Sequence, residues 1–109
     1  MPGPVDDPLL ATMTHKPRIT ISRGKDGFFQ MWLNPAGRDL LVQELQRLSE
    51  GHDHFHIMPE DMHPELPARN RPYEEGDEVI EWGKVLLRPD EWDQRYYPHV
   101  LDDPDAMPS

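Results

Sequence analysis

The fold is decided by residues 28–51, which read FFQMWLNPAGRDLLVQELQRLSEG. The first six carry no charge and are bounded by turn residues, which is typical of a strand. Alternate side chains of a strand share a face, so Phe29, Met31 and Leu33 are expected on one side. The rest of the stretch has helical character. It therefore predicts a strand that leads directly into a helix.

The helix has a clear start and a clear stop. Asn34 is a favoured N-cap, and Pro35 is tolerated next because its missing N–H would have stayed unpaired. Leucine and valine then recur at helical spacing. The helix is expected to run to about Glu50 and to end at Gly51, since glycine commonly follows a helix C-terminus.

The sequence on either side of this stretch predicts mainly strands. Alternation and β-branched residues indicate strands at 18–22, 53–58, 78–82 and 85–87, and a short helix at 89–97. Pro59 is expected to end strand pairing because it has no N–H. Residues 59–72 are predicted to be a long loop. Gly83 is expected to form a tight turn or, as the alternative, a bulge in one long strand.

These elements define an α+β fold. We expect an antiparallel sheet of four to five strands, with one main helix packed on one face and a short C-terminal helix. The length favours a single domain, with a core at residues 17–101, a tail at 1–16 and an acidic tail at 102–109. No stretch is apolar enough to span a membrane or to form a secretory signal, so a cytoplasmic protein is expected.

The net charge and the composition limit the classes of partner that the protein is expected to bind. The formal net charge is −10 and there is no cysteine, which excludes disulfides and thiolate chemistry. A negative field repels nucleic acid and anionic membranes and attracts basic proteins. The alternative is that the acidity only keeps the chain in solution.

Histidines form the most conspicuous local pattern. His54 and His56 alternate along the predicted third strand, His52 precedes them at the junction with the helix, and His63 follows nearby. Imidazoles on one face could bind a transition metal, in a metal-binding protein or a metal-dependent hydrolase. Alternate side chains begin roughly 6–7 Å apart, which is wide for one ion. The other interpretation is therefore that these are surface or cross-strand residues.

No other pattern indicates catalysis. The sequence has no phosphate-binding glycine loop and no nucleophile elbow. No carboxylate pair stands in an apolar setting that would separate the two pKa values. We expect a protein that is not an enzyme and needs no cofactor.

A surface for a protein partner is predicted around the 59–72 loop. Long loops in small domains are usually functional, and neighbouring carboxylates would steer a basic partner toward this one. Tyr97 belongs to an aromatic group with Trp92 and Tyr96, which could instead pack the last helix on the sheet. The predicted partner-binding residues are Glu60, Asp61, Glu65, Glu74, Glu75, Asp77, Glu78 and Tyr97.

Several stretches of the sequence resemble one known protein family. Residues 32–41 (WLNPAGRDLL), Glu44-Leu45 and 53–56 (DHFH) resemble the immunity protein 32 family of bacterial polymorphic toxin systems. Residues 85–90 and 97–99 look similar to proteins of the same kind. The resemblance implies a cytoplasmic protein that binds and neutralises a cognate toxin, with no reaction and no cofactor. It transfers no contact residues.

Two alternatives remain beside the toxin inhibitor. One is the metal protein described above, which would use His54, His56 and His63. The other is an adaptor or structural subunit with a groove for a peptide. An exposed edge strand would also allow a homodimer to form by sheet pairing. The acidic balance itself suits an inhibitor of a basic toxin such as a nuclease.

Overall fold

The computed structural model describes residues 16–101. Apart from Lys16, the two predicted tails lie outside the described residues. The strands are β1 (Ile19–Arg23), β2 (Phe29–Leu33), β3 (His54–Pro59), β4 (Leu66–Ala68), β5 (Glu78–Val79) and β6 (Gly83–Leu86). The helices are α2 (Pro35–Arg47) and α3 (Asp90–Tyr96), with 3-10 turns η2 (Glu60–Met62) and η3 (Pro98–Val100).

The first hairpin forms as the sequence predicts. β1 and β2 pair antiparallel, with Ile19 opposite Leu33 and Ile21 opposite Met31. Gly24 donates its N–H to the Phe28 carbonyl at 2.9 Å and so closes the turn. Gly27 in that turn has a φ of +89°, which glycine adopts without steric cost.

Helix α2 begins where the sequence places it and ends earlier. The Asn34 side chain accepts a hydrogen bond from the Gly37 N–H at 2.7 Å, as an N-cap does. The helix stops at Arg47 rather than near Glu50. The reason is a competing turn, because Ser49 and His52 exchange backbone hydrogen bonds of 2.9 and 3.1 Å.

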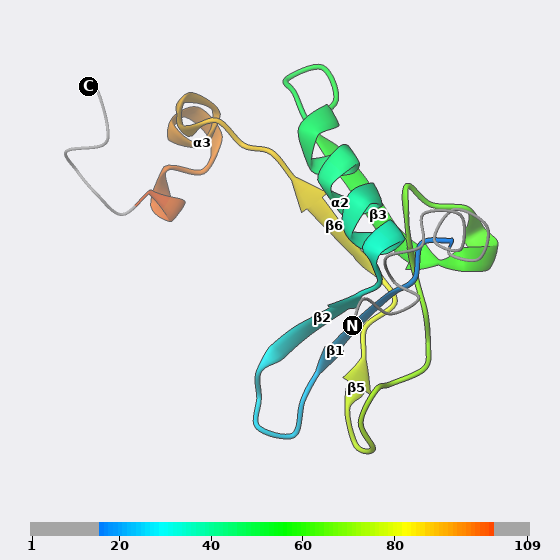
Figure 1. Ribbon diagram of the computed structural model, residues 1–109. Helices are drawn as coiled ribbons and strands as arrows, with labels where there is room; N and C mark the ends of the chain where they lie inside the picture. Colours follow the sequence, from blue (N-terminus) through cyan, green and yellow to red (C-terminus); the bar gives the residue numbers. More distant parts are fainter. Residues whose placement is uncertain (1–15, 102–109) are drawn as a thin grey trace, which may run out of the picture.

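The single sheet of four to five antiparallel strands is a wrong prediction. The described residues form two three-stranded sheets, ordered β2-β1-β5 and β4-β3-β6. β3 and β4 run parallel, with Ile57 opposite Leu66. The sheets are joined where the Arg69 N–H donates to the Ile19 carbonyl at 2.8 Å. Figure 1 shows them meeting at an angle beside α2.

The predicted 59–72 loop is also wrong in part. It contains η2 and β4, and Pro59 belongs to β3 opposite Ala68. Proline is tolerated there because it occupies the last position of the strand, where its missing N–H interrupts no continuing ladder. Leu66 and Ala68 are buried in the core. The segment therefore supplies core side chains and is not a free loop.

Gly83 forms neither the predicted turn nor a bulge. β5 pairs with β1 in the first sheet, whereas β6 pairs with β3 in the second. Gly83 is the first residue of β6 and lies opposite Ile57. The chain changes sheets between Val79 and Gly83, because the two apolar segments pack against different partners.

The core lies between α2 and the inner faces of both sheets. It consists of Ile19, Ile21, Phe55, Ile57, Leu66 and Ala68, with leucines of α2 packed on it. Helix α3 buries no residue, and Figure 1 shows it away from both sheets. The expectation that Trp92 and Tyr96 pack it on the sheet is therefore wrong.

Candidate functional site

Four carboxylates gather where two turns meet. Asp26 lies in the β1–β2 turn, and Glu74, Glu75 and Asp77 lie in the turn before β5. Pairing of β5 with β1 brings both turns to one end of the molecule (Figure 1). These four residues line a hollow of about 300 Å³ together with Gly24, Lys25 and Gln30. We call the four carboxylates the acidic tip.

Local geometry holds the acidic tip in place. The Asp77 N–H donates to the Glu74 carbonyl at 3.2 Å, and Gly76 between them has a φ of +91°. A Cβ on Gly76 would overlap the Lys25 side chain, so this lysine lies against the turn. One carboxylate oxygen of Asp77 is buried without a hydrogen-bond partner among the described residues. Lys25 is the cation that shares the hollow with the four carboxylates.

An exposed aromatic ring stands beside the acidic tip. Phe28 is 70% exposed, and its N–H donates to a carboxylate oxygen of Asp26 at 3.0 Å. An exposed aromatic ring bordered by polar groups resembles the apolar centre and polar rim of a protein interface. Glu78, which follows in β5, is also exposed.

The other predicted partner residues lie elsewhere. Glu60 and Asp61 belong to η2, and Glu60 forms ion pairs with Lys16 at 4.0 Å and Arg69 at 3.5 Å. Tyr97 follows α3 at the opposite side of the molecule (Figure 1). The predicted partner-binding residues therefore lie on separate surfaces. The reason is that η2 and β4 lie between them in the sequence and carry them to different parts of the molecule.

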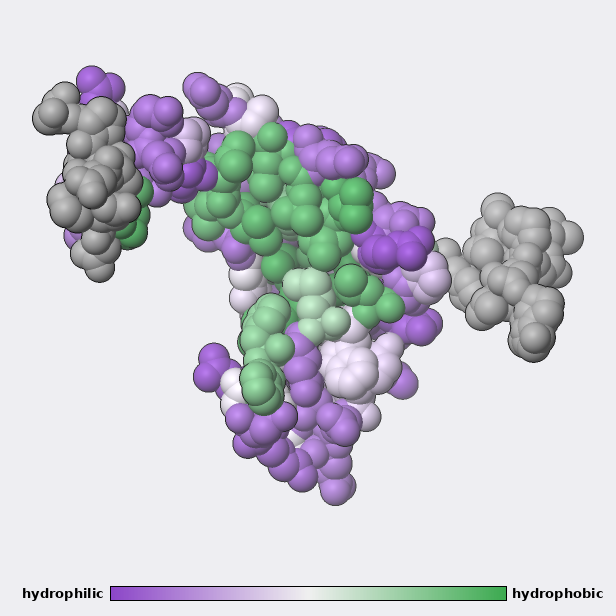
Figure 2. All heavy atoms as spheres, turned by 60° about the vertical axis from the view of Figure 1, so that its left-hand side comes forward, coloured by the Kyte–Doolittle hydropathy of each residue, from purple (hydrophilic) through white to green (hydrophobic). Residues whose placement is uncertain are grey.

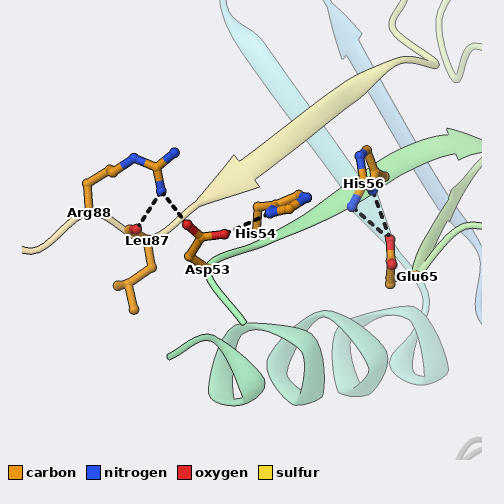
Figure 3. Close-up of polar contacts among 6 residues, drawn as sticks. All are labelled: Asp53, His54, His56, Glu65, Leu87 and Arg88. Carbon is orange, nitrogen blue, oxygen red and sulfur yellow. Dashed lines mark hydrogen bonds and ion pairs between the residues drawn. The ribbon is translucent and has the colours of Figure 1, made fainter. Parts of the chain in front are cut away.

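Histidines of β3 each face a carboxylate, as Figure 3 shows. His54 Nδ1 lies 2.8 Å from an Asp53 oxygen, and His56 Nδ1 lies 3.5 Å from a Glu65 oxygen. The two rings touch edge to face, with centroids 5.0 Å apart. The face-sharing prediction is confirmed for this pair.

Two carboxylates in this region have lowered pKa values. The hydrogen bond with His54 lowers the pKa of Asp53, and Arg88, whose Nη1 lies 3.1 Å away, adds to the effect. The backbone N–H of His56, which donates to Glu65 at 2.9 Å, lowers the pKa of Glu65. These contacts tie β3 to β4 and to the end of β6.

The structure does not bring the predicted metal ligands together. His52 lies in the turn before β3, and His63 ends η2 with a left-handed φ of 54°. Within residues 16–101, no group of three or more His, Cys, Asp or Glu side chains is placed to hold a metal ion. His54 instead contacts the carboxylate of the preceding residue, Asp53, and His56 contacts that of Glu65 just before β4, as structural residues do.

The sequence analysis did not predict a hollow that is lined by three arginines. Arg18, Arg69 and Arg71 line a space of about 310 Å³ beside Tyr73, on the side of β1 away from the core. Tyr73 stacks on Trp32 with ring centroids 4.3 Å apart. The signal was present in the sequence, because residues 67–73 place Arg69, Arg71 and Tyr73 at alternate positions after β4.

A second feature that the sequence did not reveal is an open apolar face. Figure 2 shows apolar side chains exposed together on one side of the molecule. They come from β2 and α2, and a shallow hollow with Met31, Leu33 and Arg38 joins the two elements. We call the exposed apolar side chains of these two elements, Phe29, Met31, Val42 and Leu45, the open apolar face.

Comparison of the chain with protein-family models, with curated proteins and with solved structures finds no match. The resemblance to the immunity protein 32 family therefore stays a prediction. Among residues 16–101, no helix has the length and apolar character that crossing a membrane requires.

Proposed function

We propose that this chain is a non-enzymatic inhibitor that binds a basic protein in the cytoplasm, and that this partner is a toxin of a bacterial polymorphic toxin system. The observation that carries the proposal is the acidic tip, where Asp26 joins Glu74, Glu75 and Asp77 around one hollow. The family resemblance supplies the class of partner. The acidic tip supplies the surface and its charge.

The acidic tip suits a basic partner for two physical reasons. Its charge adds to a net charge of −10, and such a field raises the rate of encounter with a positively charged surface. Phe28, exposed beside Asp26, offers an apolar anchor that a complex can bury. Lys25 shares the hollow, and a partner's lysine or arginine could displace its side chain from Gly76.

Charge reversal at the acidic tip tests the proposal. The variant carries Glu74→Lys and Glu75→Lys in the acidic tip and Glu78→Lys just after it, all at exposed positions, so that the fold is retained. The proposal requires a cognate basic toxin, and the protein encoded beside this chain's gene is the probe. We expect slower association, a flatter dependence of the association rate on salt, and less protection of cells that express the toxin.

A matched control changes the net charge equally at another place. The changes are Glu50→Lys, Asp90→Lys and Glu91→Lys, all at exposed positions. Glu50 and Glu91 line the hollow next to α3, and Asp90 is the first residue of that helix. This control should keep most of the association rate. If both triple variants slow association equally, only the overall charge matters. If the first variant binds and protects as the unaltered chain does, the acidic tip is not the site.

A further inference from the structure

Strand β2 has a free edge with unpaired backbone groups. In the part of the chain that the structure describes, β1 is its only hydrogen-bonded neighbour. Bonds from the Gly24 N–H to Phe28 and from the Asn34 N–H to Arg18 show that even-numbered residues of this segment face β1. Because the direction alternates along an antiparallel strand, Phe29, Met31 and Leu33 direct their N–H and C=O groups outward.

Nothing in β2 protects that edge against pairing. Natural edge strands usually carry charges, prolines or bulges that block association. Residues 28–33 contain none of these. Phe29 and Met31 are 64% and 36% exposed although they lie on the core-facing side of the sheet. The edge therefore combines free hydrogen-bonding groups with apolar side chains that lack cover.

We propose that two copies of this chain pair through β2, antiparallel about a two-fold axis at Met31. The outward backbone groups determine the register. Opposite residues exchange two hydrogen bonds when both direct their N–H and C=O groups toward the partner strand. Centring on Met31 meets this condition at three positions, because Met31 lies opposite itself and Phe29 lies opposite Leu33 of the second copy.

The register is self-complementary on both faces of the joined sheet. On the core-facing side, Phe29 meets Leu33 of the second copy and the two Met31 side chains meet each other. On the other side, Gln30 lies opposite Trp32 of the second copy. No like charges oppose one another, so the destabilising cross-strand pairs are avoided. A two-fold interface requires this kind of self-matching patch.

The arrangement also limits charge repulsion between the two copies. The two-fold axis directs the two acidic tips away from each other, which limits repulsion. It brings the turn that carries Asp26 toward the start of α2 in the second copy. The positive end of the α2 dipole lies there and favours negative charge, together with Arg38, which pairs with Asp39 within one copy. α2 of the second copy would also approach the exposed Phe29 ring.

Single cysteines test the register directly, because the chain has no other thiol. Opposite residues in a hydrogen-bonded pair lie about 5.5 Å apart at Cα, within the range of a disulfide. Met31→Cys should form a covalent dimer under mild oxidation. Phe29→Cys alone should not, whereas a mixture with Leu33→Cys should. Failure of Met31→Cys to cross-link would overturn the proposal.

Mass in solution tests the dimer itself. Light scattering of the full chain should give twice the chain mass at high concentration and a decrease on dilution. Met31→Lys should give a single-chain mass, because two ammonium groups would oppose each other. The control Met62→Lys, at an exposed methionine of η2, should stay dimeric. A single-chain mass for the unaltered protein at all concentrations would contradict the proposal.

Salt separates this proposal from the proposed function. Two copies that each carry −10 repel, so added salt should strengthen the dimer by screening. A complex with a basic toxin should weaken under the same change. Met31→Lys leaves the acidic tip intact and should still slow toxin action. If the unaltered chain binds the toxin but forms no dimer, the dimer proposal fails. If it forms the dimer but does not bind the toxin, the proposed function fails.

Discussion

At the scale of single residues, Asn34 links three segments of the chain. Its Oδ1 accepts from the N–H groups of Gly37 at 2.7 Å and Arg18 at 2.9 Å, and its Nδ2 donates to the Lys16 carbonyl at 2.9 Å. The side chain therefore caps α2 and also fixes the entry to β1. A cap that bonded only to its own helix would not hold the start of β1 in place.

Replacing Asn34 with alanine should destabilise the fold by about 2 kcal/mol or more, because loss of a cap costs about 1 kcal/mol and the Arg18 N–H loses its acceptor too. Asn34→Asp keeps the acceptor and loses only the donor to Lys16, so it should cost less. Urea unfolding followed by circular dichroism measures both. Equal free energies of unfolding for the two variants would contradict this assignment.

Glu65 gives a prediction with a defined pH dependence. Its pKa is lowered from 4.5 in the folded chain because the His56 N–H donates to it. A lowered pKa means stability that is present above pH 4.5 and is lost as pH falls through the folded value. Glu65→Gln should therefore lower the melting temperature slightly at pH 7 and flatten its decrease below pH 4.5. Glu75→Gln, at the acidic tip, is the control.

At the scale of elements, the position of α2 depends on its close approach to β1. A Cβ on Gly37 would lie 2.7 Å from the Arg18 carbonyl oxygen and 2.9 Å from Ile19 Cγ1. The helix can pack at this distance only with glycine there. This contact brings the leucines of α2 onto the core and leaves Val42 and Leu45 exposed on the open apolar face.

Gly37→Ala should destabilise the chain although alanine favours a helix by about 1 kcal/mol. The added methyl group meets backbone that cannot move without separating α2 from β1. Gly51→Ala is the matched control, since nothing lies within 4 Å of its Cβ position. Thermal unfolding should show a decrease for the first and almost no change for the second. A stabilised Gly37→Ala variant would refute the close approach.

At the scale of the whole molecule, α3 stands apart from the core. It buries no residue, and Trp92 lies against Arg88, with the guanidinium carbon 4.5 Å from the ring centroid. The stability of the fold should therefore come from β1, β3, β4 and α2. The hollow of about 460 Å³ between α3 and the end of α2 follows from this separation.

Removing residues 90–109 should cost about 1 kcal/mol or less, because surface contacts contribute little. The Asp53–Arg88 ion pair would remain. Leu66→Ala, in the core, should instead cost about 2–5 kcal/mol. Denaturant unfolding compares them, and a truncated chain as unstable as the Leu66 variant would show that α3 contributes to the core.

Local chemistry made part of this protein predictable. The β1–β2 hairpin follows from alternation and turn glycines, and the start of α2 follows from Asn34-Pro35. The exposure of Glu74, Glu75 and Glu78 follows from the acidic run in the sequence. The shared face of His54 and His56 follows from the two-residue period of a strand. Each signal lies within a few neighbouring residues, so no knowledge of distant partners was needed.

Strand partners and the composition of surfaces were decided only by tertiary structure. Parallel pairing of β4 with β3, the separate sheets of β5 and β6, and the meeting of Asp26 with Glu74 depend on contacts between distant segments. Strands as short as β5 have too few residues for their hydrophobic pattern to specify which strand they pair with. Their places are set by where apolar side chains such as Leu66 can be buried, and the whole chain determines that.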